Sequence, residues 1–186
     1  MKKINPDQYR EVMRHYPTGV AAITSLDADT AVPNAMIVGT LAALSLQPPL
    51  ITFSVDRSSN SWPKISKTGK FTVSLLAAEQ QDVSAALAQK KDNKLGGVNW
   101  SLSAQGTPQI DGALGWIDCT INREISAGDH LLIIADVVGM SATGGEPLIF
   151  HGGRLCGFRM PDRDGARKRD VFNAAPSGDR PTALAC

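Results

Sequence analysis

Two stretches of this sequence carry side chains that could bind a ligand. The first is Ser59-Asn60-Ser61, which comes directly before a short predicted helix that Gly69 would end. Hydroxyl groups and backbone N–H groups at a helix start can hold a phosphate, and Lys64 or Lys94 could add positive charge. From the residues alone, ordinary helix capping is the preferred interpretation of the two serines. Solvated surface lysines explain Lys64 and Lys94 as well as a phosphate site does.

The second stretch covers residues 32–55 and consists of two apolar runs with a Pro-Pro corner between them. The run 50–55 alternates apolar and polar residues, and the run 35–46 is rich in Ala, Gly and Ser. Alternation bounded by proline predicts strands. A strand of small residues lets a flat ligand approach its backbone, and Thr40 and Ser45 could add hydroxyl groups. A strand packed closely on its neighbour is the alternative.

Sequence patterns of known catalytic sites are absent. The three histidines, His15, His130 and His151, are far apart and form no metal-binding motif. There is no G-x-S-x-G nucleophile motif, no phosphate-binding loop of the nucleoside triphosphatases, and no G-x-G-x-x-G after a strand. The sequence therefore predicts no metal site.

The composition predicts one domain with an appended tail. The chain has 186 residues, of which 42% are hydrophobic, and this is enough for a sizeable core. Lys and Arg number 19 against 18 Asp and Glu, so the formal net charge is +1. That balance gives no electrostatic reason to expect a nucleic-acid or membrane partner. No apolar run reaches the length of a membrane span.

The amino terminus and the cysteines favour a cytoplasmic protein. The opening residues MKKINPDQYR contain no apolar segment after the two lysines and do not resemble a secretory signal. Cys119, Cys156 and Cys186 are odd in number and show no metal-ligand spacing. Because Cys119 and Cys156 lie in strand-like runs, we expect both to be buried free thiols.

Predicted strands outnumber predicted helices along the chain. Helices are expected over 6–16, after 61, and over 78–89; strands are expected over 20–26, 35–46, 50–55, 70–76, 115–125, 130–140, 147–150 and 154–158. Their spacing does not suggest βαβ units, so we predict an antiparallel barrel with peripheral helices. Residues 126–129 are expected to form a hairpin turn, and residues 90–100 an irregular loop. The charged, Pro-, Gly- and Ala-rich segment 160–186 is predicted to be a tail, disordered or packed on a neighbouring subunit. The expected domain is thus 1–159.

An ordered set of short motifs resembles one known family. The motifs are Pro17-Thr18-Gly19-Val20, Leu44–Leu50, Ser59-Asn60-Ser61, Phe71–Leu76, Gly106-Thr107-Pro108, Gly112–Cys119, Gly128-Asp129-His130, and Pro147–Phe150 with Gly153-Arg154. Together they make the chain, from about Tyr9 to Phe158, similar to the short-chain flavin reductases, the reductase components of two-component flavin monooxygenases. The resemblance implies a mainly β fold, the FMN-binding split β-barrel, antiparallel and of Greek-key type, with peripheral helices.

The same resemblance implies a function. Such a protein is an NAD(P)H:flavin oxidoreductase that reduces FMN or FAD with NADH or NADPH and releases the reduced flavin to a partner monooxygenase. It is a homodimer with the flavin near the subunit interface. Because the flavin carries the hydride chemistry, no acid–base pair is required of the protein. This agrees with the absence of catalytic motifs.

The resemblance also implies which residues contact the cofactors. His130 would lie on the nicotinamide side, although a turn histidine that faces solvent is the alternative. The flavin-binding residues would be Thr18, Gly39, Thr40, Leu41, Ala42, Ser45, Ser59, Ser61, Ser74 and Lys94.

The chain departs from the family in one motif. Family members carry G-M-T-x-N-S-F where this chain has AMIVGTL, residues 35–41. The Thr and Asn that would hydrogen-bond the flavin are here Ile37 and Gly39, and the Ser is Thr40. Each lost hydrogen bond costs about 0.5–1.5 kcal/mol of binding free energy. The departure favours one alternative, a split barrel that binds flavin or another ligand without reductase activity. A further alternative, which the family motifs also fit, is a protein that keeps flavin as a fixed prosthetic group and oxidises or reduces an organic substrate.

Overall fold

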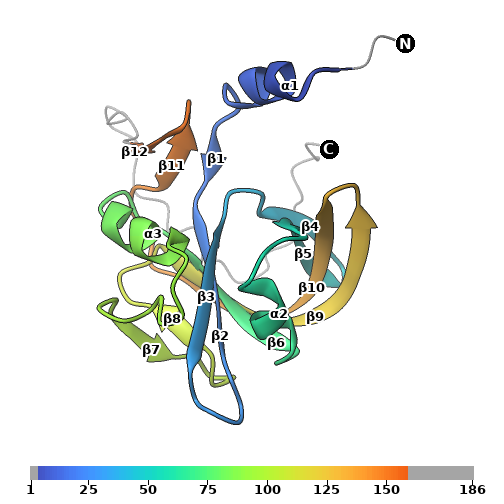
Figure 1. Ribbon diagram of the computed structural model, residues 1–186. Coiled ribbons are helices and arrows are strands. Elements are labelled where there is room, and N and C mark those ends of the chain that lie inside the picture. Colours follow the sequence, from blue (N-terminus) through green and yellow to red (C-terminus); the bar gives the residue numbers. More distant parts are fainter. Residues whose placement is uncertain (1–3, 159–186) are drawn as a thin grey trace, which may run out of the picture.

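The computed structural model describes residues 4–158, and within this range strands outnumber helices (Figure 1). The helices are α1 (Pro6–Met13), α2 (Trp62–Ser66) and α3 (Gln81–Ala88). The strands are β1 (Thr18–Gly19), β2 (Ala21–Leu26), β3 (Pro33–Val38), β4 (Ala42–Leu46), β5 (Pro49–Asp56), β6 (Lys70–Leu75), β7 (Trp100–Leu102), β8 (Pro108–Ile110), β9 (Gly115–Ala127), β10 (His130–Ala142), β11 (Leu148–His151) and β12 (Arg154–Gly157). The predicted tail 160–186, with Cys186, lies outside the described residues.

One large antiparallel sheet organises the fold. Its strand order is β3-β2-β6-β9-β10-β5-β4, so β3 and β4 form its two edges. Strands β1, β11 and β12 form a small sheet, and β7 pairs with β8. The predicted mainly β, antiparallel architecture is confirmed, and so is the hairpin between β9 and β10, whose turn uses Gly128 at φ 64°. The β7–β8 pair was not predicted from the sequence.

Two hydrophobic clusters lie on opposite faces of β2 and β3. The first fills the barrel, where Phe53, Trp62 and Phe71 meet edge to face with ring centroids 5.5–6.3 Å apart. The second lies under α3 and contains Leu87 and Leu148. Residues Ile51, Phe53 and Val55 point inward, as the alternation in β5 predicts. Strands β2 and β3 therefore contribute side chains to both clusters, and β3 lies between the barrel interior and the packing of α3.

The predicted strand over 35–46 is wrong, because the structure divides this run into β3 and β4. Strand β3 ends at Val38 and β4 begins at Ala42, at opposite edges of the large sheet. Thr40 lies in the turn between them. Its hydroxyl accepts the backbone N–H of Ser54 at 2.9 Å and donates to the carbonyl of Ser54 at 3.2 Å. These two bonds fasten the turn between β3 and β4 to β5.

The cysteine predictions are half correct. Cys119 is buried in the barrel, and burial, followed by the nearby charges of Asp118 and Asp136, raises the pKa of its thiol to about 12. Cys156, predicted to be buried, is exposed in β12 because the small sheet packs only one face on the barrel.

Within residues 4–158, no helix combines the length and the apolar character needed to cross a membrane.

Candidate functional site

A recess of about 570 Å³ opens between β3, the loop after β5, the end of α3 and the loop that follows it. Its polar lining includes the hydroxyls of Ser58, Ser59 and Ser61 and the ammonium groups of Lys64, Lys90, Lys91 and Lys94. We call it the serine–lysine recess. Three residues predicted to bind the cofactor meet here, Ser59, Ser61 and Lys94, although Lys94 is more than 30 positions from the two serines.

The two predicted serines have different roles in this recess. The hydroxyl of Ser59 accepts the backbone N–H of Trp62 at 3.2 Å, so Ser59 does cap the start of α2. Ser61 makes no capping bond with its side chain. Its hydroxyl instead accepts a hydrogen bond from Lys94 Nζ at 2.9 Å. The Ser61 hydroxyl proton and the remaining Lys94 protons can therefore be donated to an anionic ligand.

Positive charge is concentrated around Ser61. Burial lowers the pKa of Lys94, and the nearby charge of Lys64 lowers it further. Lys64 is itself paired with Asp92, with Nζ and Oδ1 3.0 Å apart. An anion bound between Lys94 and Lys64 would compensate both the lost hydration and the like-charge repulsion. The recess is therefore suited to a phosphate group.

Asp56 supplies fixed negative charge at one side of the serine–lysine recess. Its carboxylate accepts the backbone N–H and the hydroxyl of Ser58, both at 2.7 Å. These hydrogen bonds, and then the charge of His130, hold the pKa of Asp56 below its ordinary value. A bound phosphate is thus expected on the lysine side, away from Asp56.

An apolar recess of about 340 Å³ adjoins the serine–lysine recess. It lies between the end of β3, α3, β11 and β12, and its lining includes Val38, Ala85, Phe150 and Leu155. The two recesses share Ile37 and Ala88. A ligand with an anionic end and a flat, largely apolar end could extend across both.

Thr18 and Gly39 are brought together next to the apolar recess. Gly39 lines the recess, and a Cβ atom added to it would lie 2.9 Å from Thr18 Oγ1. Thr18 is placed by the pairing of β1 with β11, opposite Phe150. A side chain at position 39 would therefore have to displace the Thr18 hydroxyl, and glycine leaves that hydroxyl in place.

Besides Thr18, which lies next to the apolar recess without lining it, five predicted flavin-binding residues line neither recess. Thr40 is bonded to Ser54, Leu41 packs against the first hydrophobic cluster, and Ala42 and Ser45 lie in β4 at the other edge of the sheet. Ser74 is fully buried in β6, where its hydroxyl accepts the backbone N–H of Ile110 at 3.0 Å. The structure of a single protomer therefore gives them no contact with a ligand in these recesses. Ser74 holds the β7–β8 pair to the barrel instead.

His130 lies beside the serine–lysine recess without lining it. It is paired in register with Asp56 across β10 and β5, and its Nδ1 lies 2.7 Å from Asp129 Oδ1. This contact lowers the pKa of the Asp129 carboxyl. The assignment of His130 to the nicotinamide side stays a prediction.

Sequence reasoning missed several residues of the serine–lysine recess. Lys90, Lys91 and Asp92 belong to a segment that was interpreted only as an irregular loop. The signal that could have found them is the run KKDNK over 90–94, which concentrates cations just after a predicted helix.

Comparison with known proteins gives a consistent result. The profile of the family described as "Flavin reductase like domain" matches residues 13–159. A flavin reductase from Pseudomonas putida is 40% identical over 156 residues, which cover 83% of this chain and 91% of that protein. HsaB, the reductase subunit of a flavin-dependent monooxygenase from Mycobacterium tuberculosis, is 35% identical over 175 residues, 92% of each chain.

Solved structures agree with the sequence relatives. Nitrilotriacetate monooxygenase component B from Mycobacterium thermoresistibile is 34% identical with a TM-score of 0.79, covering 91% of this chain and 95% of that one. The NADH:FAD oxidoreductase SgcE6 from Streptomyces globisporus, solved with NAD and FAD fragments, is 28% identical with a TM-score of 0.79, covering 88% of this chain and 100% of that one.

Proposed function

This chain belongs to the flavin reductase-like family and is an NAD(P)H-dependent flavin reductase, and on that premise we propose how its recesses hold the flavin. The resemblance predicted from the short motifs is confirmed, and so is the split-barrel fold. The reading as a flavin reductase is supported over a barrel that binds ligands without reductase activity.

The flavin phosphate would occupy the serine–lysine recess. Ser61 and Lys94 would donate to it, and the neighbouring lysines would balance its charge. The single observation that carries this proposal is the 2.9 Å contact between Ser61 and Lys94, because it leaves both groups able to donate to an anion. Ser59 would act indirectly, by fixing the loop before α2 through its bond to Trp62.

The isoalloxazine ring would lie toward the apolar recess, over Ile37 and Gly39 and against Ala88 of α3. Bound flavin accepts a hydride from the nicotinamide and so supplies the redox chemistry. The residues of this recess would exclude water from one face of the ring and orient it. Thr18 would present its hydroxyl at the rim beside Gly39, close to where the family's asparagine side chain would begin.

The reduced flavin would then leave for a partner monooxygenase. The relatives include reductase components of two-component monooxygenases, which supports such a partner. Release of flavin as a diffusible product, and a cytoplasmic location where NAD(P)H is available, are parts of the same proposal.

We further propose that the chain is a homodimer. Helix α1 stands apart from the barrel (Figure 1) and none of its residues is buried. Tyr9 and Val12 of α1, and Tyr16 just after it, are 59–69% exposed. A second copy of the chain that covers these side chains would remove that apolar surface from water.

The enzymatic part is tested by mixing purified protein with FMN or FAD and with NADH or NADPH, and following the nicotinamide absorbance band. A fall in absorbance that depends on both flavin and protein is the expected result. Absence of turnover with all four combinations would contradict the assignment. Saturable quenching of flavin fluorescence without turnover would indicate a carrier instead.

A further inference from the structure

A third recess, of about 510 Å³, lies on the other side of the Lys64–Asp92 ion pair from the serine–lysine recess. Both residues of the pair line both recesses. The remaining walls come from the loop between β2 and β3 and from the start of α2. We call this space the hairpin recess, lined by Asp27, Thr30, Val32, Asn34, Pro63 and Lys67 besides the pair.

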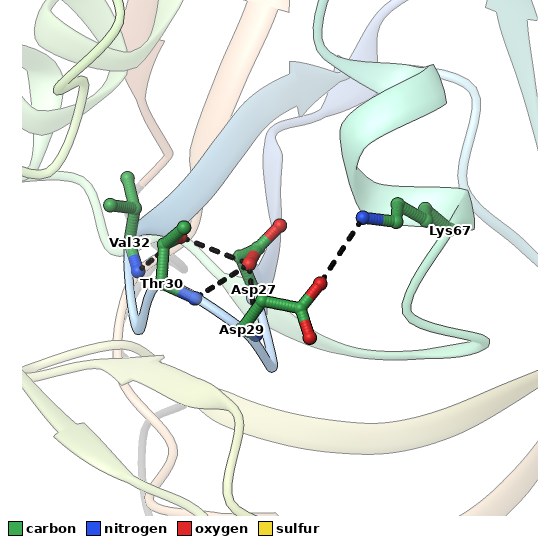
Figure 2. A network of polar contacts seen from close by, with 5 residues as sticks. All are labelled: Asp27, Asp29, Thr30, Val32 and Lys67. Carbon is green, nitrogen blue, oxygen red and sulfur yellow. Dashed lines mark hydrogen bonds and ion pairs between the residues drawn. The ribbon is translucent and has the colours of Figure 1, made fainter.

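The loop that forms the hairpin recess is held by its own hydrogen bonds (Figure 2). Asp27 Oδ1 accepts the backbone N–H of Asp29 at 3.0 Å and both the N–H and the hydroxyl of Thr30 at 2.9 Å. Lys67 Nζ lies 3.4 Å from Asp29 Oδ2 and connects the loop to the end of α2. The wall is therefore formed before a ligand binds, which lowers the entropic cost of binding.

Asn34 is the polar group of this recess that the fold leaves incompletely bonded. Only 8% of the residue is exposed. Within residues 4–158, the only hydrogen bond of its side chain is the donation from Nδ2 to the Val32 carbonyl at 3.5 Å, the far limit for such a bond. The side-chain carbonyl has no protein partner there. It is not enclosed, because Ser25 Oγ is the one fully buried side-chain polar atom without a partner in these residues. The carbonyl is therefore open to a ligand in the recess that Asn34 lines.

Apolar surface lies beside this amide. The side chain of Val32 is 45% exposed, and Pro63 lines the recess from α2. An amide that can donate and accept, next to apolar side chains that can cover a ring, matches the needs of a heteroaromatic base. Asparagine pairs with adenine in this way, accepting from the exocyclic amine and donating to a ring nitrogen.

We propose that the hairpin recess binds the adenosine end of FAD, and that the flavin substrate of this enzyme is therefore the dinucleotide. The inference rests on the proposed function, in which the flavin phosphate occupies the serine–lysine recess. The second phosphate of FAD would lie near Lys64, which lines both recesses. Asp27 would accept hydrogen bonds from the ribose hydroxyls, as carboxylates do in dinucleotide sites.

The adenosine of NAD(P)H has the same chemistry and is the alternative source. The position of the hairpin recess favours FAD. The two residues that it shares with the serine–lysine recess, where the flavin phosphate is proposed to bind, are Lys64 and Asp92. A pyrophosphate that crosses this pair joins the two recesses in one ligand.

The test measures dissociation constants of FMN and FAD for the full chain by quenching of flavin fluorescence. We expect FAD to bind about tenfold more tightly than FMN. Val32→Glu, a change at an exposed side chain, and Asn34→Leu, a change at a buried one, should remove that advantage and leave the FMN constant within about twofold. Leu102→Glu is the matched control, because Leu102 is 56% exposed in β7 and lines none of the three recesses.

The outcomes separate this inference from the proposed function. Equal binding of FMN and FAD by the unaltered protein, or equal weakening of both by Val32→Glu, overturns the adenosine site even while NADH oxidation with FMN continues. If Val32→Glu raises the KM for NADH and leaves the FAD constant unchanged, the recess belongs to the nicotinamide dinucleotide and the assignment to FAD is wrong. Absence of any flavin binding or turnover overturns the proposed function as well.

Discussion

The serine–lysine recess and the run of small residues over 35–46 were both expected to contact one ligand, but only the recess brings most of its predicted residues together. In the recess, segments that are far apart in sequence converge, so that Ser61 and Lys94 come within 2.9 Å. In the run, the chain turns over residues 39–41, so that β3 and β4 are the first and last strands of the large sheet instead of one continuous strand. Only the part of the run that ends at Gly39 reaches a recess.

The difference shows what holds each region in place. The recess is built from loops whose polar groups bond to one another, as Ser59 does to Trp62 and Lys94 does to Ser61. In the run, the side chain of Thr40 bonds to the backbone N–H and carbonyl of Ser54, in place of a backbone group of a continuing strand. A polar side chain in a turn can thus complete the hydrogen bonds of the neighbouring strand where the sequence pattern predicts that the first strand continues.

The largest expected effect is on FMN binding, when the positive charge of Lys94 is removed from the serine–lysine recess. Lys94→Met keeps the length of the side chain and removes a charge-assisted hydrogen bond, which contributes about 1.5–3 kcal/mol. The dissociation constant of FMN should rise about 10–100-fold. Riboflavin, which has no phosphate, should bind as before, and this comparison is the control. Equal weakening of both flavins would show that Lys94 does not contact the phosphate.

A smaller effect is expected from pH. Burial and Lys64 lower the pKa of Lys94, so its charge is lost at a lower pH than that of an ordinary lysine. Only the protonated form attracts a phosphate strongly, so FMN affinity should fall as pH rises through this lowered pKa. Lys94→Arg should flatten the dependence, because arginine stays charged. A fall that is unchanged in this variant, or that appears equally with riboflavin, would assign the titration to another group.

The turn that divides the run can be tested by stability. Thr40→Val removes both hydrogen bonds to Ser54 and should lower the free energy of unfolding by about 1 kcal/mol, measured by urea denaturation. Thr40→Ser keeps the hydroxyl and is the matched control. If the valine variant is as stable as the serine variant, the hydroxyl does not hold the turn to β5.

A loss of stability of similar size is expected from the close approach of Gly39 and Thr18. Gly39→Ala should cost on the order of 1 kcal/mol of unfolding free energy, because its Cβ would lie 2.9 Å from Thr18 Oγ1. The cost should shrink in a Thr18→Ala background. Gly19→Ala is the control, since a Cβ there meets nothing within 4 Å. Equal costs in both backgrounds would mean that the two residues do not interact.

The fold was largely predictable because its signals are local. Alternation such as that of Ile51, Phe53 and Val55 identified the long strands, and Gly128 marked the β9–β10 turn. The three-residue strands β7 and β8 are too short to show any period. Their position depends on Ser74 and its bond to Ile110, which no local pattern reveals.

The sequence located residues of the serine–lysine recess only where a single short motif supplies them. Ser59 and Ser61 lie in one short loop, so that finding the loop located both. The pairing of Ser61 with Lys94 depends on how the loop after α3 folds back, and this is a tertiary contact. Ala42 and Ser45 stay predictions; they lie in β4 and not in the two recesses, and the turn over residues 39–41 that sets the position of β4 is a tertiary feature that the sequence pattern did not show.

A crystal structure of the protein with bound FMN tests the central claim most directly. We expect the phosphate to lie between the hydroxyl of Ser61 and the ammonium group of Lys94, with the ring extending past Ile37 toward Gly39. A phosphate bound elsewhere, or a ring whose dimethylbenzene end occupies the serine–lysine recess, would contradict the account.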